Sequence, residues 1–377
     1  MHDATLRLVL LATALTGIPL ASIGQSGTID TNVLSPTGPE ASSSLAFDCL
    51  ARPAVAYFHQ SAGEVRYARW NGTSWPHESV AVVNASPADL AFSASCDPVI
   101  AYRDLTAGGV VKHAKRLPGA APSWVVTTVE AKTGAEISLA FDPAGLEGMA
   151  YEDDTTDRLR YSHWNGSAWS SGDVPTGAGT VIARSPSLAF DPSGRPHITY
   201  YEISPANALK HISYNGTSWD PPTLIETDAS YESSLVLHGD PYVSYHNDAT
   251  NVLRLARKSG GIWSAQDVPT GLGSYIASFT SLAFLPSGYP ALTCFDEGPA
   301  DAVKLVKWNG TSWDAPVIVA SGTAEASSLA SPSTGGVGVT YYDLVNGNLR
   351  IFTMPEPGVA GLLTSALLIA MLGRRAG

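Results

Sequence analysis

The chain has 377 residues, of which 35 are glycine and 26 are proline, while only 15% carry a charge. This composition is typical of a turn-rich, all-β globular protein and disfavours a helical or disordered chain. The formal net charge of −12 lacks the basic footprint that a phosphate backbone requires, which excludes nucleic acid as a partner.

Residues 1–24 are predicted to be a secretory signal peptide. Arg7 supplies a positive start, an apolar run follows over residues 8–21, and Ser22-Ile23-Gly24 fits a small-residue cleavage site. A membrane anchor is the alternative, but the run is short for a membrane span. The protein is therefore expected to be exported.

A unit of 45 to 49 residues then recurs along almost the whole chain. Its clearest copy, residues 187–219, contains strand-like runs at 187–190, 197–201 and 209–214, and a fourth that opens at Trp219. We name these strands A, B, C and D. The leucine of strand A recurs at Leu45, Leu90, Leu139, Leu188, Leu235, Leu282 and Leu329. A period in the forties with several strands per unit is typical of a β-propeller blade.

Two turn sequences punctuate the unit. An Asp-Pro-Ser-Gly turn joins strand A to strand B, as at residues 191–194. Asn-Gly pairs that start at Asn71, Asn165, Asn215 and Asn309 join strand C to strand D. Because both residues of such a pair tolerate positive φ, we predict tight hairpins there. The same triplets match the N-glycosylation sequon, but the turn explains their recurrence.

The last repeat lacks the Trp-led fourth strand, whereas residues 28–34 look like a fourth strand without its first three. We predict that this N-terminal strand pairs beside residues 349–352, which closes the ring and removes its open edges. The prediction is an all-β, seven-bladed β-propeller with four-stranded blades over residues 25–353.

Three cysteines are too few for a disulfide scaffold. Cys49 and Cys96 fall in equivalent A–B turns of neighbouring repeats. A bridge between them in an oxidising compartment and a pair of free thiols both remain open. Cys294 replaces a strand B tyrosine and is expected to be a small buried residue.

Residues 354–377 form a tail in three parts. Pro355-Glu356-Pro357 is followed by an apolar run over residues 359–372, and Arg374-Arg375 stands near the end. Such a run with terminal arginines can insert in a membrane. The tail resembles the PEP-CTERM sorting signal of Gram-negative bacteria, which an exosortase is thought to cleave. The resemblance implies a cell-surface location, with a plain C-terminal anchor as the alternative.

Short, formulaic A–B and C–D turns are expected on one face of the propeller, and variable B–C and D–A loops on the other. We call these the turn face and the loop face. Because binding residues gather on variable loops of a rigid scaffold, a site is predicted on the loop face, at the mouth of the central channel.

Strand B ends and strand C begins with polar residues in every repeat. Strand B ends at His59, Asp104, Asp153, Glu202, Asn247, Asp296 and Asp343, and strand C begins near Arg66, Lys112, Arg160, Lys210, Arg254, Lys304 and Arg350. Cross-strand ion pairs within each blade would explain both sets. In repeats 1 and 5, His59 and Asn247 leave the arginine without that acid. The candidate ligand-binding residues are His59, Arg66, Asp153, Asn247 and Arg254.

No catalytic or cofactor-binding motif is present, and no metal is assigned from the sequence. The densest acidic run, residues 152–157, could hold Ca²⁺, although it departs from the EF-hand pattern and lacks its glycine.

The C–D turn with its tryptophan resembles the Asp-box of sialidase-like propellers. Residues 214–219 and 308–313 match it loosely, with Asn215 and Asn309 where that family has aspartate. The turn also looks like the repeats of fucose-binding lectins. The sorting tail, the regularity of the repeats and the absence of a catalytic motif together predict a surface-sorted propeller that binds or scaffolds extracellular polysaccharide or protein without catalysis. The alternative is a sialidase-like glycoside hydrolase or a polysaccharide lyase.

Overall fold

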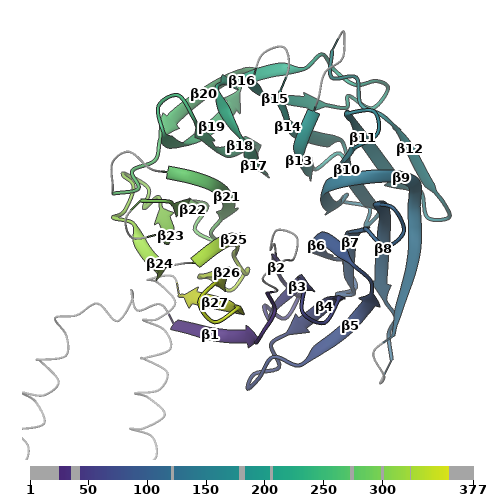
Figure 1. Cartoon of the computed structure of the whole chain (residues 1–377). Helices are drawn as coiled ribbons and strands as arrows, with labels where there is room; N and C mark the ends of the chain where they lie inside the picture. The colour runs from purple at the N-terminus through teal and green to yellow at the C-terminus, as the bar shows by residue number, and fades with distance from the viewer. Residues whose placement is uncertain are drawn as a thin grey trace, which may run out of the picture.

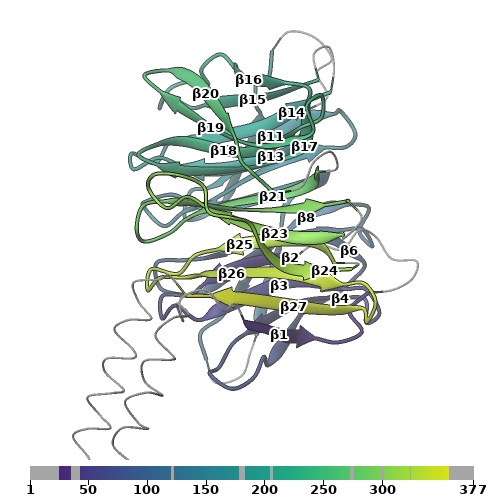
Figure 2. The ribbon, with the colours of Figure 1, turned by 90° about the vertical axis from the view of Figure 1, so that its left-hand side faces the viewer.

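In the computed structural model, the described residues are 25–34, 43–119, 123–177, 183–203, 207–271, 276–298, 301–322 and 324–355. They form antiparallel sheets arranged in a ring (Figure 1), which is a disc when viewed from its edge (Figure 2). Strand A of each blade lies at the centre of the ring and strand D at its perimeter. The predicted seven-bladed propeller is confirmed.

The first four blades follow in chain order. Blade 1 is β2 (Ser43–Phe47), β3 (Pro53–His59), β4 (Glu64–Arg69) and β5 (His77–Val82). Blade 2 is β6 (Ala85–Phe92), β7 (Pro98–Asp104), β8 (Val110–Arg116) and the first part of β9 (Trp124–Phe141). Blade 3 is the second part of β9, then β10 (Glu147–Asp153), β11 (Arg158–Trp164) and β12 (Trp169–Asp173). Blade 4 is β13 (Ala183–Phe190), β14 (Pro196–Glu202), β15 (Ala208–Ser213) and β16 (Thr223–Thr227).

The other three blades complete the ring. Blade 5 is β17 (Ala229–His238), β18 (Asp240–Asn247), β19 (Val252–Ser259) and β20 (Ile262–Asp267). Blade 6 is β21 (Ile276–Phe284), β22 (Pro290–Asp296), β23 (Ala302–Lys307) and β24 (Val317–Ser321). Blade 7 is β25 (Ala324–Ala330), β26 (Val337–Asp343), β27 (Asn348–Met354) and β1 (Gln25–Asp30).

The first strand of the chain thus completes the last blade, as predicted. β1 pairs antiparallel with β27, and the register places Thr28 opposite Arg350. The strand starts three residues earlier than the predicted segment. Beyond it, the Val33 N–H donates to the Gly347 carbonyl over 2.7 Å, which continues the attachment. Both ends of the propeller, Gln25 and Met354, lie on the turn face.

A ring of hydrogen bonds explains the recurring Ser-Leu pair of strand A. The leucine N–H of one blade donates to the serine Oγ of the preceding blade, as from Leu188 to Ser138 over 3.0 Å and from Leu45 to Ser328 over 3.0 Å. At one junction an aspartate replaces the serine, and Asp89 Oδ2 accepts the Leu139 N–H at 2.8 Å. Because each bond joins two blades, the Ser-Leu pair recurs to hold neighbouring blades together and not to stabilise the sheet of a single blade.

Seven hydrophobic clusters fill the spaces between neighbouring blades. Six of them include the tryptophan that opens or precedes strand D of the following blade: Trp75, Trp124, Trp169, Trp219, Trp263 and Trp313. Such a ring has no single central core, so the stability of each blade depends on both of its neighbours.

The Asn-Gly turns differ from the predicted tight hairpins. Only the glycine of each pair has a positive φ, for example Gly216 at 103°. The asparagine instead caps a longer turn with its side chain, since Asn215 Oδ1 accepts the Thr217 and Ser218 N–H groups at 3.0 and 3.1 Å. Asn71, Asn165 and Asn309 make the same contacts. The side-chain cap removes the need for positive φ at asparagine.

The two cysteines of the A–B turns are bridged. Cys49 and Cys96 form a disulfide with their Cα atoms 5.7 Å apart, which ties blade 1 to blade 2 on the turn face. Cys294 is a free, fully buried cysteine, as predicted. The predicted signal peptide and the sorting residues Glu356, Pro357, Arg374 and Arg375 lie outside the described residues, which end at Pro355. Within the described ranges, no helix is long and apolar enough to span a membrane.

Candidate functional site

Three arginines on the loop face bridge neighbouring blades instead of pairing with the end of their own strand B. Arg66 donates to Asp30 Oδ2 of β1 at 2.8 Å, and the Tyr57 hydroxyl donates to the same oxygen at 2.6 Å. Arg66 thus has no acid at the end of its own strand B and pairs instead with Asp30 of the preceding blade and with Glu64, 2.9 Å from its Nε. The contact with Asp30 is one that alignment of the repeats alone does not reveal.

The same three-residue clamp recurs in blades 3 and 5. Arg160 binds Glu130 of the preceding blade at 2.7 Å, and the Tyr151 hydroxyl donates to that carboxylate at 2.6 Å. Arg254 likewise binds Glu226 of the preceding blade, which also accepts the Tyr245 hydroxyl at 3.2 Å. Arg254 thus also finds its acids away from the end of its own strand B, where Asn247 stands.

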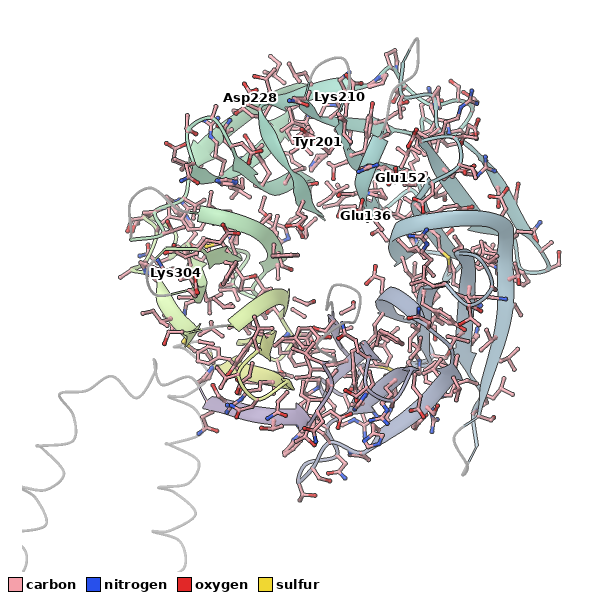
Figure 3. The ribbon with its side chains drawn as sticks, in the orientation of Figure 1. Glu136, Glu152, Tyr201, Lys210, Asp228 and Lys304 are labelled. Carbon is pink, nitrogen blue, oxygen red and sulfur yellow. A yellow bond between two sulfur atoms is a disulfide. The ribbon has the colours of Figure 1, made fainter. Side chains whose placement is uncertain are left out.

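The predicted ion pairs within a blade form at three of the seven positions. Lys210 pairs with Glu202 at 2.6 Å, Lys304 pairs with Asp296, and Arg350 pairs with Asp343 at 3.4 Å. Lys210 and Lys304 are labelled in Figure 3. In blade 2 the pairing is replaced, since Lys112 Nζ donates to Thr128 Oγ1 and Asp104 accepts a backbone N–H of its own turn.

The other predicted ligand residues serve the local turns. Asp153 Oδ1 accepts the Thr155 N–H at 3.0 Å, and Asn247 Oδ1 accepts the Thr250 N–H at 2.9 Å. His59 Nδ1 accepts the Ala62 N–H, and its Nε2 lies 3.8 Å from Asp30. The structure brings His59 and Arg66 together at Asp30, but Asp153 and Asn247 lie in other blades. Among the described residues, no group of three potential metal ligands gathers, in the acidic run or elsewhere.

The described cavities lie on the turn face, between neighbouring blades. One of about 520 Å³ lies between blades 2 and 3 and is lined by His113, Glu147 and Trp169. Cavities of about 400 Å³ lie between blades 3 and 4, beside Trp219, and between blades 5 and 6, beside Trp308. We call them groove 2/3, groove 3/4 and groove 5/6. The predicted site on the loop face remains a prediction.

An aromatic pair from the C–D turn of the following blade stands at each groove; both rings line grooves 2/3 and 3/4, and Trp308 alone of its pair lines groove 5/6. One member is the recurring tryptophan and the other is the residue paired with it across the turn. The pairs are Trp164 with Trp169, Tyr214 with Trp219, and Trp308 with Trp313, with ring centres 5.6, 5.6 and 5.3 Å apart. Because these rings are tilted against each other, each pair presents an apolar edge and face to the space between the blades.

At two other junctions a cation occupies the position opposite the tryptophan. Arg116 lies opposite Trp124 and binds Glu78 of blade 1 at 2.8 Å. Lys258 lies opposite Trp263, and its Nζ is 3.4 Å from His211 Nδ1 and 5.8 Å from the Trp263 ring centre. Both cations contact the preceding blade. They occupy the space between the blades that stays open at the three grooves, where an aromatic residue stands in the same position.

Groove 2/3 combines its aromatic border with ionisable groups. Glu147 is only 5% exposed, and its Oε1 lies 3.8 Å from His113 Nε2 and 3.9 Å from Lys115 Nζ. Burial alone would raise the pKa of Glu147, but the adjacent His113, backbone and Lys115 hold that pKa below its usual value. The carboxylate is therefore ionised at neutral pH.

The other two grooves carry different polar groups. In groove 3/4, His163 Nε2 lies 3.4 Å from Asp142 Oδ2, next to Ser170 and Ser171. In groove 5/6, the Arg257 guanidinium stands 5.5 Å from the centre of the Tyr242 ring. Each groove can therefore combine stacking on an aromatic ring with hydrogen bonds to a polar ligand.

The grooves were not predicted, although the sequence contains a signal for them. An aromatic residue directly precedes Asn71, Asn165, Asn215 and Asn309, and Trp70 forms the same kind of pair with Trp75 in blade 1, whereas blades 2 and 5 lack the Asn-Gly turn and have Arg116 and Lys258 instead. The aromatic residues were interpreted as core because they recur. Recurrence does not separate a buried ring from one that borders an open groove.

The comparisons with known proteins agree with the architecture. The sequence matches no protein-family model, and no curated protein is significantly similar to it. Among solved structures, a PL25 ulvan lyase bound to -[GlcA(1-4)Rha3S]- is similar with a TM-score of 0.61 at 10% identity, over 90% of this chain and 96% of that chain.

Two fungal proteins are similar over slightly less of the chain. AofleA from Arthrobotrys oligospora has a TM-score of 0.53 at 10% identity, over 81% of this chain and 93% of that chain. A variant of Aleuria aurantia lectin in complex with Fucα1-6GlcNAc has a TM-score of 0.53 at 13% identity, over 78% and 99%. At these identities the likeness shows the β-propeller fold alone.

Proposed function

We propose that the protein is a non-catalytic, carbohydrate-binding β-propeller that attaches to extracellular polysaccharide through grooves 2/3, 3/4 and 5/6. The observation that carries the proposal is the aromatic pair at each groove, set against the cations that fill the equivalent space at two other junctions. Sugars have apolar C–H faces and many hydroxyl groups, so they suit a stacking ring beside charged and hydroxyl side chains.

Several similar sites on one rigid ring favour a polymer over a free monosaccharide. When one sugar unit of a chain is bound, the next binding event becomes intramolecular, and the overall affinity can exceed that of a single site by about 10² to 10⁴-fold. This is our reason for preferring polysaccharide to a protein partner, the other extracellular ligand that we considered.

We further propose export and sorting to the surface of a Gram-negative bacterium. The Cys49–Cys96 bridge supports an oxidising compartment. An exosortase-type enzyme would process the tail, which would hold the chain in the membrane before cleavage. Since Met354 ends on the turn face, a retained tail would turn the three grooves toward the cell's own surface.

Replacement of the groove aromatics tests the proposal. Each of Trp164→Ala, Tyr214→Ala and Trp308→Ala is expected to weaken binding to extracellular polysaccharide by about tenfold, and the triple variant by about 100-fold or more. Binding is measured on immobilised exopolysaccharide by surface plasmon resonance. Ile262→Ala is the control, because Ile262 is 74% exposed and lines none of the three grooves. Unchanged binding by the triple variant, or no glycan binding by the unmodified protein, would refute the proposal.

A second candidate function is polysaccharide cleavage on the loop face. Glu152 is buried at the end of β10, and burial raises its pKa to about 7 despite the opposing effect of Arg184. Glu136 of β9 lies beside it at the inner side of the ring, where both are labelled in Figure 3. A carboxyl group that holds its proton near neutral pH suits general acid catalysis in a glycoside hydrolase or lyase.

This second function predicts a catalytic loss without a binding loss. If Glu152 donates the proton, Glu152→Gln is expected to lower the rate of polymer cleavage by about 100-fold or more and to leave polysaccharide binding unchanged. The measurement follows new reducing ends or unsaturated products during incubation with the polymer. If the unmodified protein releases neither product, cleavage is rejected as its activity.

A further inference from the structure

Glu147 breaks the pattern at the first position of strand B. Five blades have proline there: Pro53, Pro98, Pro196, Pro241 and Pro290. The register confirms the equivalence, since Glu147 pairs with Phe141 as Pro196 pairs with Phe190. A buried carboxylate costs several kcal/mol of desolvation unless it is compensated, so its presence in place of proline calls for a partner.

The groups around Glu147 are close but do not complete its hydrogen bonding. His113 Nε2 at 3.8 Å and Lys115 Nζ at 3.9 Å from Oε1 both lie beyond hydrogen-bond length. His113 Nε2 is buried and has no hydrogen-bond partner among the described residues. Thr127 Oγ1 lies 3.4 Å from Nδ1, and in the tautomer in which it donates to that nitrogen the ring proton is on Nε2.

A donor and an acceptor therefore lie 3.8 Å apart, and an oxygen atom beside the line that joins them can contact both. An oxygen about 2.8 Å from each can accept from His113 Nε2 and donate to Glu147 Oε1. Both side chains line groove 2/3, so this position lies at the wall of the groove. Lys115 Nζ, on the other side of the same carboxylate oxygen, can donate to a neighbouring ligand oxygen.

We propose that groove 2/3 is a selective subsite for a neutral sugar unit with two adjacent hydroxyl groups, one held between His113 and Glu147 and the other by Lys115. The inference rests on the proposed carbohydrate binding and deepens it. The sugar's apolar face lies against Trp169, whose ring centre is 5.3 Å from that of His113. A uronic acid or sulfate at this position is disfavoured, because its negative charge would approach the Glu147 carboxylate.

The test uses Tyr214→Ala/Trp308→Ala as the background, so that groove 2/3 alone retains its aromatic pair among the three grooves. Methyl glucoside, methyl galactoside, methyl mannoside and the methyl glycoside of glucuronic acid are titrated by calorimetry. At least one neutral glycoside is expected to bind tighter than the glucuronoside by about tenfold or more. Adding Glu147→Gln is expected to weaken that glycoside by about tenfold and to strengthen the glucuronoside, because the repulsion is removed while Lys115 remains.

A second substitution keeps the test independent of folding defects. Glu147→Pro restores the residue that five blades already accommodate, and it is expected to weaken the neutral glycoside at least as much as glutamine does. A ratio of neutral to acidic glycoside affinity that both substitutions leave unchanged would overturn the inference while the polysaccharide binding of the full ring still stands. Failure of the proposed carbohydrate binding would be seen separately, because the unmodified protein would then bind no polysaccharide.

Discussion

Replacing Asp30 by alanine is expected to lower the free energy of unfolding by about 3 kcal/mol or more. Its side chain on β1 is only 12% exposed and accepts hydrogen bonds from Tyr57 and Arg66 of blade 1. Removing the carboxylate leaves the Tyr57 hydroxyl and the Arg66 Nη1 group without this acceptor, which costs about 1 to 3 kcal/mol for each buried group, while Arg66 keeps Glu64 at 2.9 Å from its Nε. The effect is measured by urea unfolding, with proteolysis near the N-terminus as a check on the detachment of β1.

Asp267 provides a matched control in blade 5. It also binds a clamp arginine, since its Oδ1 is 3.0 Å from Arg254 Nε, but its side chain is 68% exposed. Solvent screening limits such a pair to about 1 kcal/mol or less, so Asp267→Ala should unfold close to the unmodified protein. Equal losses in the two variants would contradict the view that the clamp at β1 depends on burial.

Acidification is expected to weaken the junction between blades 4 and 5. His211 of β15 is buried against His197 Nδ1 at 3.0 Å and Lys258 Nζ at 3.4 Å, with Asp191 and Asp220 farther out. Burial, and then the charges of Lys258 and His197, lower the pKa of His211 to about 2, and burial also lowers the pKa of His197. The folded state therefore resists protonation that the unfolded chain accepts near pH 6.5.

The sign of the pH dependence follows from that difference. Above pH 6.5 the buried histidine has no effect on stability, and below it stability falls by about 1.4 kcal/mol per pH unit until the folded pKa is reached. At pH 4.5 His211 alone should cost about 2.7 kcal/mol. Urea unfolding at pH 7.5 and pH 4.5 measures the loss.

His211→Leu isolates this contribution, because Leu255 and Leu305 occupy the same strand position in blades 5 and 6. The variant is expected to match the unmodified protein within about 1 kcal/mol at pH 7.5 and to exceed its stability at pH 4.5. All carboxylates remain in both proteins, so their shared acid response cancels. If the two proteins lose the same stability on acidification, His211 is not the group responsible.

The architecture could be predicted because the repeat appears directly as a regular spacing of residues along the chain. The spacing of Leu45 to Leu329 predicts the number of blades, and the missing fourth strand of the last repeat predicts where β1 pairs. These features depend on pattern and count, which survive in a single sequence. The outcome for Cys49 and Cys96 was left open because sequence gives no distance between neighbouring turns.

The candidate site could not be read in the same way. Arg66 has no acid at the end of its own strand B, and its partner Asp30 lies in a different blade, which only the closed ring brings near. Trp164 and Arg116 occupy equivalent positions, each opposite the recurring tryptophan of its blade. Groove 2/3 stays open beside Trp164, whereas Arg116 fills the equivalent space between blades 1 and 2. Such differences arise from the packing of two blades against each other, and neither blade's sequence contains them alone.

The pairing of β1 with β27 also means that the ring cannot close until the last strand of the propeller has been synthesised. Asn32 and Asn348, which are hydrogen-bonded at this junction, stand 316 positions apart in the chain. At a synthesis rate of about 5 to 20 residues per second, the earliest strand waits roughly 15 to 60 s before its partner exists. During that interval β1 has no partner strand, and its unpaired edge can recruit another polypeptide. Maturation is therefore vulnerable to misassembly until its final segment arrives.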